Sequence, residues 1–147
     1  MNEYRDTFAS LIRFCQDFST DMAAFGFNLK VMNLDAMADP QEWPDQDVIG
    51  VAEFDFELDD GTIQVDLMVA VSTFEDTNNF RLNELLNHLV NRLLPNQRIK
   101  LLNANNGAAR GFLYVRNGTR VAPPFKSTTR AIQPVMVSLL SDQILRP

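Results

Sequence analysis

The chain has 147 residues, of which 46% are hydrophobic and 22% charged, and this composition suits one folded α/β domain over residues 1–147. No run of about 18 apolar residues occurs, which excludes a membrane-spanning helix, and the polar start does not have the pattern of a signal peptide. The single cysteine excludes a disulfide framework and any multi-cysteine zinc or iron–sulfur site. We therefore expect no cofactor, no metal and no enzymatic activity.

The net charge of −6 is distributed unevenly along the chain. Residues 1–76 hold 17 acidic and 3 basic side chains, whereas residues 77–147 hold 2 acidic and 10 basic ones. Such opposite charges favour copies of the chain that meet head to tail, with an acidic surface against a basic one. A solvated acidic surface explains the same numbers, so both interpretations stand. Repulsion of phosphates argues against duplex DNA as a ligand of the acidic half.

The first element is an amphipathic helix from Tyr4 to Met22, which the spacing of apolar residues by three and four predicts. Gly26 is its expected stop. Cys15 lies on the apolar side of this helix, so we expect a buried side chain rather than a nucleophile.

A short strand at 27–32 is expected next, followed by a long acidic loop over about residues 33–47. This loop contains two prolines and the single tryptophan, Trp43. Trp43 is either a cover for the edge of the core or an interface anchor, because tryptophan is enriched at binding hot spots.

A β-hairpin follows, and its register follows from its turn. Asp60–Gly61 is typical of a two-residue type I′ turn, which places Phe56 opposite Val65 and Phe54 opposite Leu67. All apolar pairs then fall on one face of the hairpin. The opposite face collects acidic side chains, namely Glu53, Asp55, Glu57 and Asp66.

In this register Asp55 faces Asp66 directly, and like charges in such a pair destabilise a sheet. Three hypotheses explain the acidic face: plain solvent exposure, a metal ion held by Asp55 and Asp66, or a surface kept negative. No further ligands at a recognisable spacing support the metal ion.

The second helix is predicted from Leu82 to Leu94, where leucines repeat at helical spacing up to Pro95. His88 lies on its flank, where a structural role is expected. Short strands are expected at 99–102, 112–116 and 119–122, and a last strand at 133–140 with Pro134 near its start, which favours a sheet edge. Together the elements predict an α+β fold of two long amphipathic helices packed on a mainly antiparallel sheet.

The prolines at 123 and 124 predict an extended basic arm over about residues 123–130. Basic residues in and before this arm have few acidic neighbours in the sequence. Their expected partners are carboxylates elsewhere in this chain or in an adjacent copy, which makes them candidate interface residues: Arg110, Arg116, Arg120, Lys126 and Arg130.

The element order, with the stretches Gly111–Val115, Gly118–Pro124 and Val135–Leu140, resembles the tail terminator and neck proteins of tailed bacteriophages over residues 3–142. That family has no invariant motif, so the resemblance lies in the order of the elements and in the general character of these stretches. It implies a small α/β subunit that forms a ring, usually a hexamer, on the end of the tail tube. The implied partners are other tail tube, sheath or connector proteins, and the implied location is the virion tail, after synthesis in the host cytoplasm.

A ring closes through two different surface patches, which one acidic and one basic patch per copy would supply. The acidic face of the hairpin would line a channel through which DNA passes without specific binding. Two alternatives stay open: a ring at the baseplate end of the tail, and an acidic adaptor or inhibitor that mimics nucleic acid for a basic partner. Enzymatic activity would require Asp55 and Asp66 to hold a metal ion.

Overall fold

The structure is a computed structural model that describes residues 3–34 and 40–141, without the side chains of Gln41 and Glu53. The two α-helices are α1 (Glu3–Ala23) and α2 (Phe80–Asn91), and single 3-10 turns lie at Pro40–Glu42 and Thr77–Asn79. The strands are β1 (Leu29–Asn33), β2 (Asp47–Asp59), β3 (Thr62–Phe74), β4 (Arg98–Leu102), β5 (Ala109–Val115), β6 (Arg120–Val121), β7 (Phe125–Lys126) and β8 (Arg130–Ser141).

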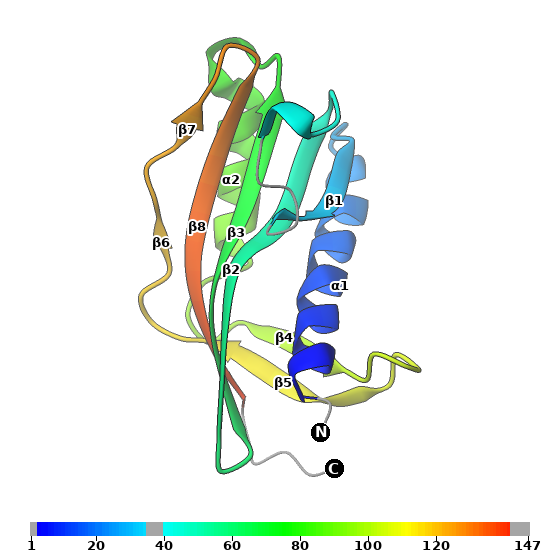
Figure 1. The fold of residues 1–147 in the computed structure, drawn as a ribbon. Coiled ribbons are helices and arrows are strands. Elements are labelled where there is room, and N and C mark those ends of the chain that lie inside the picture. Colours follow the sequence, from blue (N-terminus) through cyan, green and yellow to red (C-terminus); the bar gives the residue numbers. More distant parts are fainter. Residues whose placement is uncertain (1–2, 35–39, 142–147) are drawn as a thin grey trace.

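All of these strands belong to one mixed sheet. Its order is β1-β2-β3-β8-β5-β4, and β6 and β7 pair with β8 as well. Both helices pack on the same face (Figure 1): α1 contacts β1, β2 and β4, and α2 contacts β3 and β8. Because α1 touches β1 and β4, which end the strand order on either side, the sheet curls around this helix. The apolar buried residues of α1 are Leu11, Cys15, Phe18 and Met22.

The predicted fold of two long helices on a mainly antiparallel sheet is wrong. Only α1 is long, with 21 residues, whereas α2 has 12 residues and ends at Asn91. Strands dominate the chain, and β1 pairs with β2 in parallel. The leucine spacing misled the prediction, because Leu93 is only 1% exposed although it lies in the turn after α2. Pro95 disfavours helical geometry just before it, so the chain leaves the helix early.

Two segments predicted to lack sheet pairing belong to strands. β2 begins at Asp47, inside the predicted loop 33–47, and its first residues pair with β1; residues 35–39 of that loop lie outside the described part. Within the predicted arm 123–130, Phe125 pairs with Ile132 and Lys126 with Ala131. Val48 and Ile49 at the start of β2 are both fully buried, so this part of the strand shows no polar alternation that the sequence would have revealed.

The hairpin register is confirmed next to the turn. Phe56 pairs with Val65 and Asp55 with Asp66, and the positive φ angles of Asp60 (50°) and Gly61 (75°) fit a type I′ turn. The predicted pair of Phe54 with Leu67 falls in a register shift between Ala52 and Asp55, where no regular pair forms. This β-bulge sets two residues of β2 against one of β3 and bends the strand.

Pro134 lies in an interior strand, contrary to the predicted edge. β8 pairs with β3 along one side and with β5, β6 and β7 along the other. The carbonyl of Pro134 accepts a hydrogen bond from Ala122 N–H, so its backbone faces the β6–β7 side. That side is interrupted between β6 and β7, which accommodates a residue without an N–H group.

As far as the described residues go, the sheet face opposite the helices is covered at one end only. There Trp43 packs in a second buried cluster with Met32, Leu34, Val48 and Ala70. Towards the tip of the β2–β3 hairpin this face carries exposed or partly exposed side chains. We call this opposite side of the sheet the outer face.

Candidate interaction surfaces

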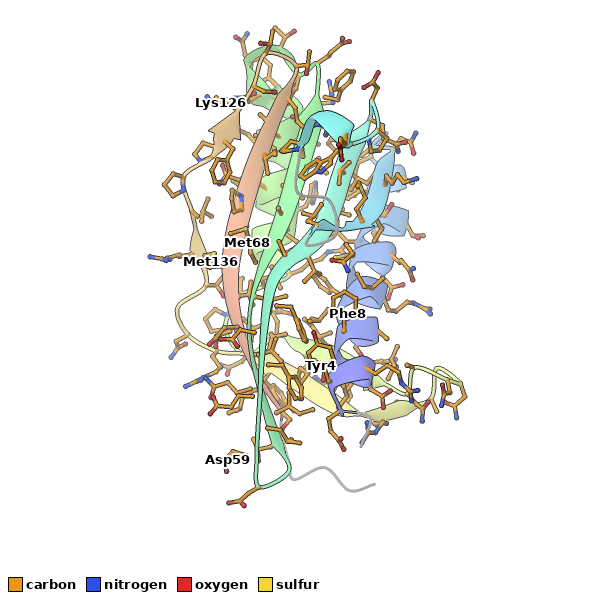
Figure 2. All side chains as sticks on the ribbon, viewed as in Figure 1. Tyr4, Phe8, Asp59, Met68, Lys126 and Met136 are labelled. Carbon is orange, nitrogen blue, oxygen red and sulfur yellow. The ribbon has the colours of Figure 1, made fainter. Side chains whose placement is uncertain are left out.

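The end of the β2–β3 hairpin carries five exposed carboxylates, which we call the acidic hairpin surface: Asp55, Glu57, Asp59, Asp60 and Asp66. Asp59 lies at the hairpin end that projects from the molecule (Figure 2). Within the described residues none of the five forms an ion pair. Ser138 Oγ donates a 2.5 Å hydrogen bond to Asp66 Oδ1. Glu53 of the predicted acidic face lies in β2, but its side chain is outside the described residues.

A metal ion held by Asp55 and Asp66 would need further ligands close by. Among residues 3–34 and 40–141, no three His, Cys, Asp or Glu side chains come close enough to hold a metal ion together. Two exposed carboxylates are fewer oxygen ligands than a protein-bound Ca²⁺ ion takes. The geometry therefore offers no further ligand that would favour the metal hypothesis.

Arg110 is engaged within the chain. Its guanidinium lies 2.5 Å from Asp6 Oδ2 and 3.4 Å from Glu3 Oε1. The Arg110 side chain is only 17% exposed, and Asp6 also accepts a hydrogen bond from Ala104 N–H. The expected carboxylate partners of this base therefore come from its own chain, and they fix β5 to the start of α1.

Arg130 is also engaged within the chain, together with Trp43. Its guanidinium donates hydrogen bonds to Pro44 O (2.5 Å), Gln46 O (3.2 Å) and Ser72 Oγ (2.9 Å). Burial lowers the pKa of Arg130, an effect opposed by the charges of Asp47 and Asp45. Trp43 is only 8% exposed, so it covers the core, as the first of the two sequence interpretations had it, rather than standing out as an anchor.

The other three predicted interface bases are exposed: Arg116 follows β5, Arg120 lies in β6 and Lys126 in β7. None of them forms an ion pair within the described residues. The same arm exposes two apolar side chains, Val121 (46%) and Phe125 (63%). The structure shifts the bounds of the predicted arm of residues 123–130, and from here on the basic arm means residues 120–126, from β6 to β7.

Sequence reasoning missed two exposed bases on β4, Arg98 and Lys100. They alternate with Ile99 and Leu101, which are buried in the core. This alternation is visible in the sequence and already indicates a strand with one basic face. Neither base forms an ion pair in the described part of the chain, although Arg98 lies 4.6 Å over the ring of Phe112.

The strand register brings both charges onto the outer face. Directly paired residues share a face of the sheet. One such line of paired residues crosses the sheet from the acidic hairpin surface to β4 and consists of Glu57, Gln64, Leu140, Tyr114 and Arg98. A second line consists of Ala52, Met68, Met136 and Arg120, and Figure 2 shows its two methionines beside each other. The outer face is thus acidic at the β2 side, partly apolar in the middle and basic at β4 and β6.

The structure supports the packing roles expected for Cys15 and His88. Cys15 is fully buried, and burial raises the pKa of its thiol to about 12. Such a thiol stays protonated and unreactive near neutral pH. His88 packs against Phe25, with ring centroids 4.7 Å apart. Both residues serve packing in this fold.

No known protein family matches this chain, and no curated protein is recognisably related to it. Neither helix of the described residues is long and apolar enough to cross a bilayer.

Proposed function

We propose that the chain is a structural subunit of a closed homo-oligomeric ring at the end of a phage tail tube, of the tail terminator or neck type. The observation that carries the proposal is the separation of unpaired charge on the outer face. The acidic hairpin surface belongs to β2 and β3, and most of the exposed bases without an ion pair belong to β4, β6 and β7, while Arg116 follows β5 and Lys30 lies on β1.

This separation suits a heterologous interface, in which one patch of a subunit meets a different patch of the next. When the rotation between neighbours closes, such an interface generates a ring. Ion pairs within the chain already engage several bases, which are therefore not free to bind a neighbouring subunit. Arg81 binds Asp47 at 3.1 Å, Arg92 binds Asp21 at 2.7 Å and Arg110 binds Asp6 at 2.5 Å. Arg5 and Arg13 also pair within the chain, with Asp6 and Asp17. Among the described residues no such partner is found for a further set of exposed bases, which includes Arg98, Lys100, Arg116, Arg120 and Lys126.

The basic arm supplies a second feature suited to a subunit contact. Pro123 and Pro124 separate β6 from β7 and restrict the backbone between them. A stiff segment loses less conformational entropy when it docks, and exposed Val121 and Phe125 offer apolar area beside the charges of Arg120 and Lys126.

The acidic hairpin surface also suits a ring through which DNA passes. Carboxylates of this surface that are not used in subunit contacts, such as Asp59, Asp60 and Asp66, would repel phosphates, so a channel lined by them would not retain DNA. A negative lining accounts for the facing pair Asp55 and Asp66, whose mutual repulsion the isolated subunit has no evident need to bear.

Localisation in virions tests the tail role. Antibodies raised against the purified protein would be applied, with gold label, to tailed particles from the host that encodes the chain. Label at the head-proximal end of the tail is the expected result. Label at the distal tip would indicate a baseplate-end ring instead. Particles without label, together with a monomeric purified protein, would contradict the proposal and favour the acidic adaptor or inhibitor.

A further inference from the structure

The structure points to how adjacent subunits join: we propose that β4 of one copy pairs in parallel with residues 55–59 of β2 in the next copy. The two sheets would then continue into each other around the ring. This inference rests on the proposed function, because it assigns the two patches of that ring interface. It names a specific junction that the ring proposal by itself does not require.

Each of these two segments is an open strand edge. β1 covers β2 only from Asp47 to Val51, so within the described residues the hairpin half of β2 has a strand partner on its β3 side alone. β4 pairs only with β5 in the same part of the chain. Both segments have five residues, Asp55–Asp59 and Arg98–Leu102.

The backbone groups of β4 that face the open edge can be identified. Gln97 O accepts a hydrogen bond from Val115 N–H, so the carbonyl of Gln97 points towards β5. Alternate residues of a strand direct their N–H and C=O groups to opposite sides. Those of Arg98 and Lys100 therefore point away from β5. The hydrogen bond of Leu102 fits this alternation, because its N–H also points away from β5 and donates to Ser10 Oγ of α1.

The corresponding groups of β2 follow from the turn. In a two-residue hairpin the flanking pair Asp59 and Thr62 bond to each other, so alternate residues bond across to β3 from there. Phe56 and Leu58 consequently direct their N–H and C=O groups to the open edge. On β3 of the same chain, Ile63 N–H donates to Ser141 Oγ and so points away from β2, as this alternation of bonded residues requires.

The alternation of edge-facing backbone groups in β2 and in β4 favours parallel over antiparallel pairing. The edge-facing residues of β2 carry core-side side chains, Phe56 and Leu58, whereas those of β4 carry outer-face side chains, Arg98 and Lys100. In an antiparallel ladder the bonded residues oppose each other and share a face, so the outer face of one copy would continue into the core side of the next. In a parallel ladder a bonded residue sits between two bonded residues of the partner, so like faces stay together.

The parallel register then places acidic side chains of β2 opposite basic side chains of β4. With Phe56 bonded between Arg98 and Lys100, the facing pairs are Asp55 with Arg98, Phe56 with Ile99, Glu57 with Lys100 and Leu58 with Leu101. Two ion pairs form on the outer face and two apolar pairs on the core side. Phe56 and Leu58 are only partly buried in the isolated chain, so this contact would cover them further.

The groove beside β4 and the projecting β2–β3 hairpin offer space for this junction. A groove of about 420 Å³ lies between α1 and β4, lined among others by Phe14, Asp17, Arg98 and Lys100. Figure 1 shows β4 beside the N-terminal half of α1 and the β2–β3 hairpin projecting free of the helices. Four successive antiparallel pairings lead from β2 to β4, so the two strands are parallel in the order of the sheet, although Figure 1 shows that the twist of the sheet sets β5 and β4 across the direction of β2. For β2 to lie beside β4 of the next copy in parallel, the rotation between neighbouring copies has to compensate for this twist.

Charge reversal tests the junction in the full-length protein. Glu57→Lys and Lys100→Glu each convert the central ion pair into a like-charged contact, and each variant alone should associate at least about tenfold more weakly than wild type at low salt. An equimolar mixture of the two should recover assembly, because both kinds of junction between them are again oppositely charged. Glu84→Lys on α2 and Lys30→Glu on β1 change the same charges at exposed positions away from the junction and should assemble normally.

The outcomes separate this inference from the ring proposal. If wild type assembles but both junction variants assemble equally well, or the mixture gains nothing, the junction is wrong and the ring stands. If wild type is monomeric at all concentrations, both fail. A chain carrying Glu57→Cys and Lys100→Cys adds a geometric test, since facing residues of neighbouring strands lie within disulfide reach. Oxidation should give a ladder of linked subunits, and the control pair Glu57→Cys with Lys30→Cys should not.

Discussion

The guanidinium of Arg130 lies 5.4 Å from the ring centroid of Trp43 and binds the carbonyl of Pro44 in the same loop. This contact joins the first residue of β8 to the segment that covers the outer face at one end of the sheet. Phe74 lies at the same distance from Arg130, so the cation sits between two aromatic rings. A residue expected at a subunit interface therefore holds the fold of its own subunit.

Replacing Arg130 by methionine should destabilise the protein by about 1–3 kcal/mol, because three hydrogen bonds and the contacts with Trp43 and Phe74 are lost. Urea unfolding measures the free energy, and the emission of the single tryptophan reports whether its cover has loosened. Lys126→Met removes an exposed charge in the same region and should change neither. Equal stability of the Arg130 and Lys126 variants would show that the buried guanidinium does not hold the loop.

Neutralising Asp55 and Asp66 together, as asparagines, should leave the free energy of unfolding unchanged or raise it by about 0.2–1 kcal/mol, since repulsion between the facing carboxylates is relieved. Thermal unfolding at concentrations where the protein is dissociated measures this effect. Divalent cations should not alter the result. A loss of stability that appears only in their presence would revive the metal hypothesis. The same variant should assemble less well, because Asp55 loses its charge at the proposed junction.

Burial raises the pKa of the Cys15 thiol from 9.0 to about 12. Because the folded pKa is the higher one, the contribution of the thiol to stability is fully present below pH 9. It falls as the pH rises from 9 towards 12, where the unfolded chain ionises and the folded chain does not, by at most about 1.4 kcal/mol per pH unit. Unfolding curves of wild type and Cys15→Ala across this pH range should therefore converge as the pH rises. Parallel curves would contradict a protonated buried thiol.

Reversing the charges of Arg120 and Lys126 to glutamate should weaken self-association or attachment to the tail, most clearly at low salt. Both side chains are exposed, so the melting temperature of the dissociated chain should barely move. Arg130 is left out of this set because its burial would confound the result. Sedimentation across salt concentrations measures the effect. Unchanged assembly would mean that the basic arm is a solvated surface.

Sequence patterns predicted the hairpin best, because the turn Asp60–Gly61 and strict alternation determine a register locally. The β-bulge before Asp55 was not predicted, because no residue type in the sequence marks the position of the inserted residue. The interior place of Pro134 depends on where β6 and β7 stop, which is a tertiary property. Charge counting found the acidic hairpin surface. It could not distinguish Arg110 and Arg130 from the exposed bases, because their side-chain partners lie between 58 and 107 residues away in the sequence.

The mass of the purified wild-type protein under native conditions tests the central claim most directly. Native mass spectrometry over a range of protein and salt concentrations should give one closed oligomer of fixed copy number, which appears as a ring in electron micrographs and dissociates as salt rises. A species with the mass of a single chain at every concentration, in low salt as well as high, would contradict the account.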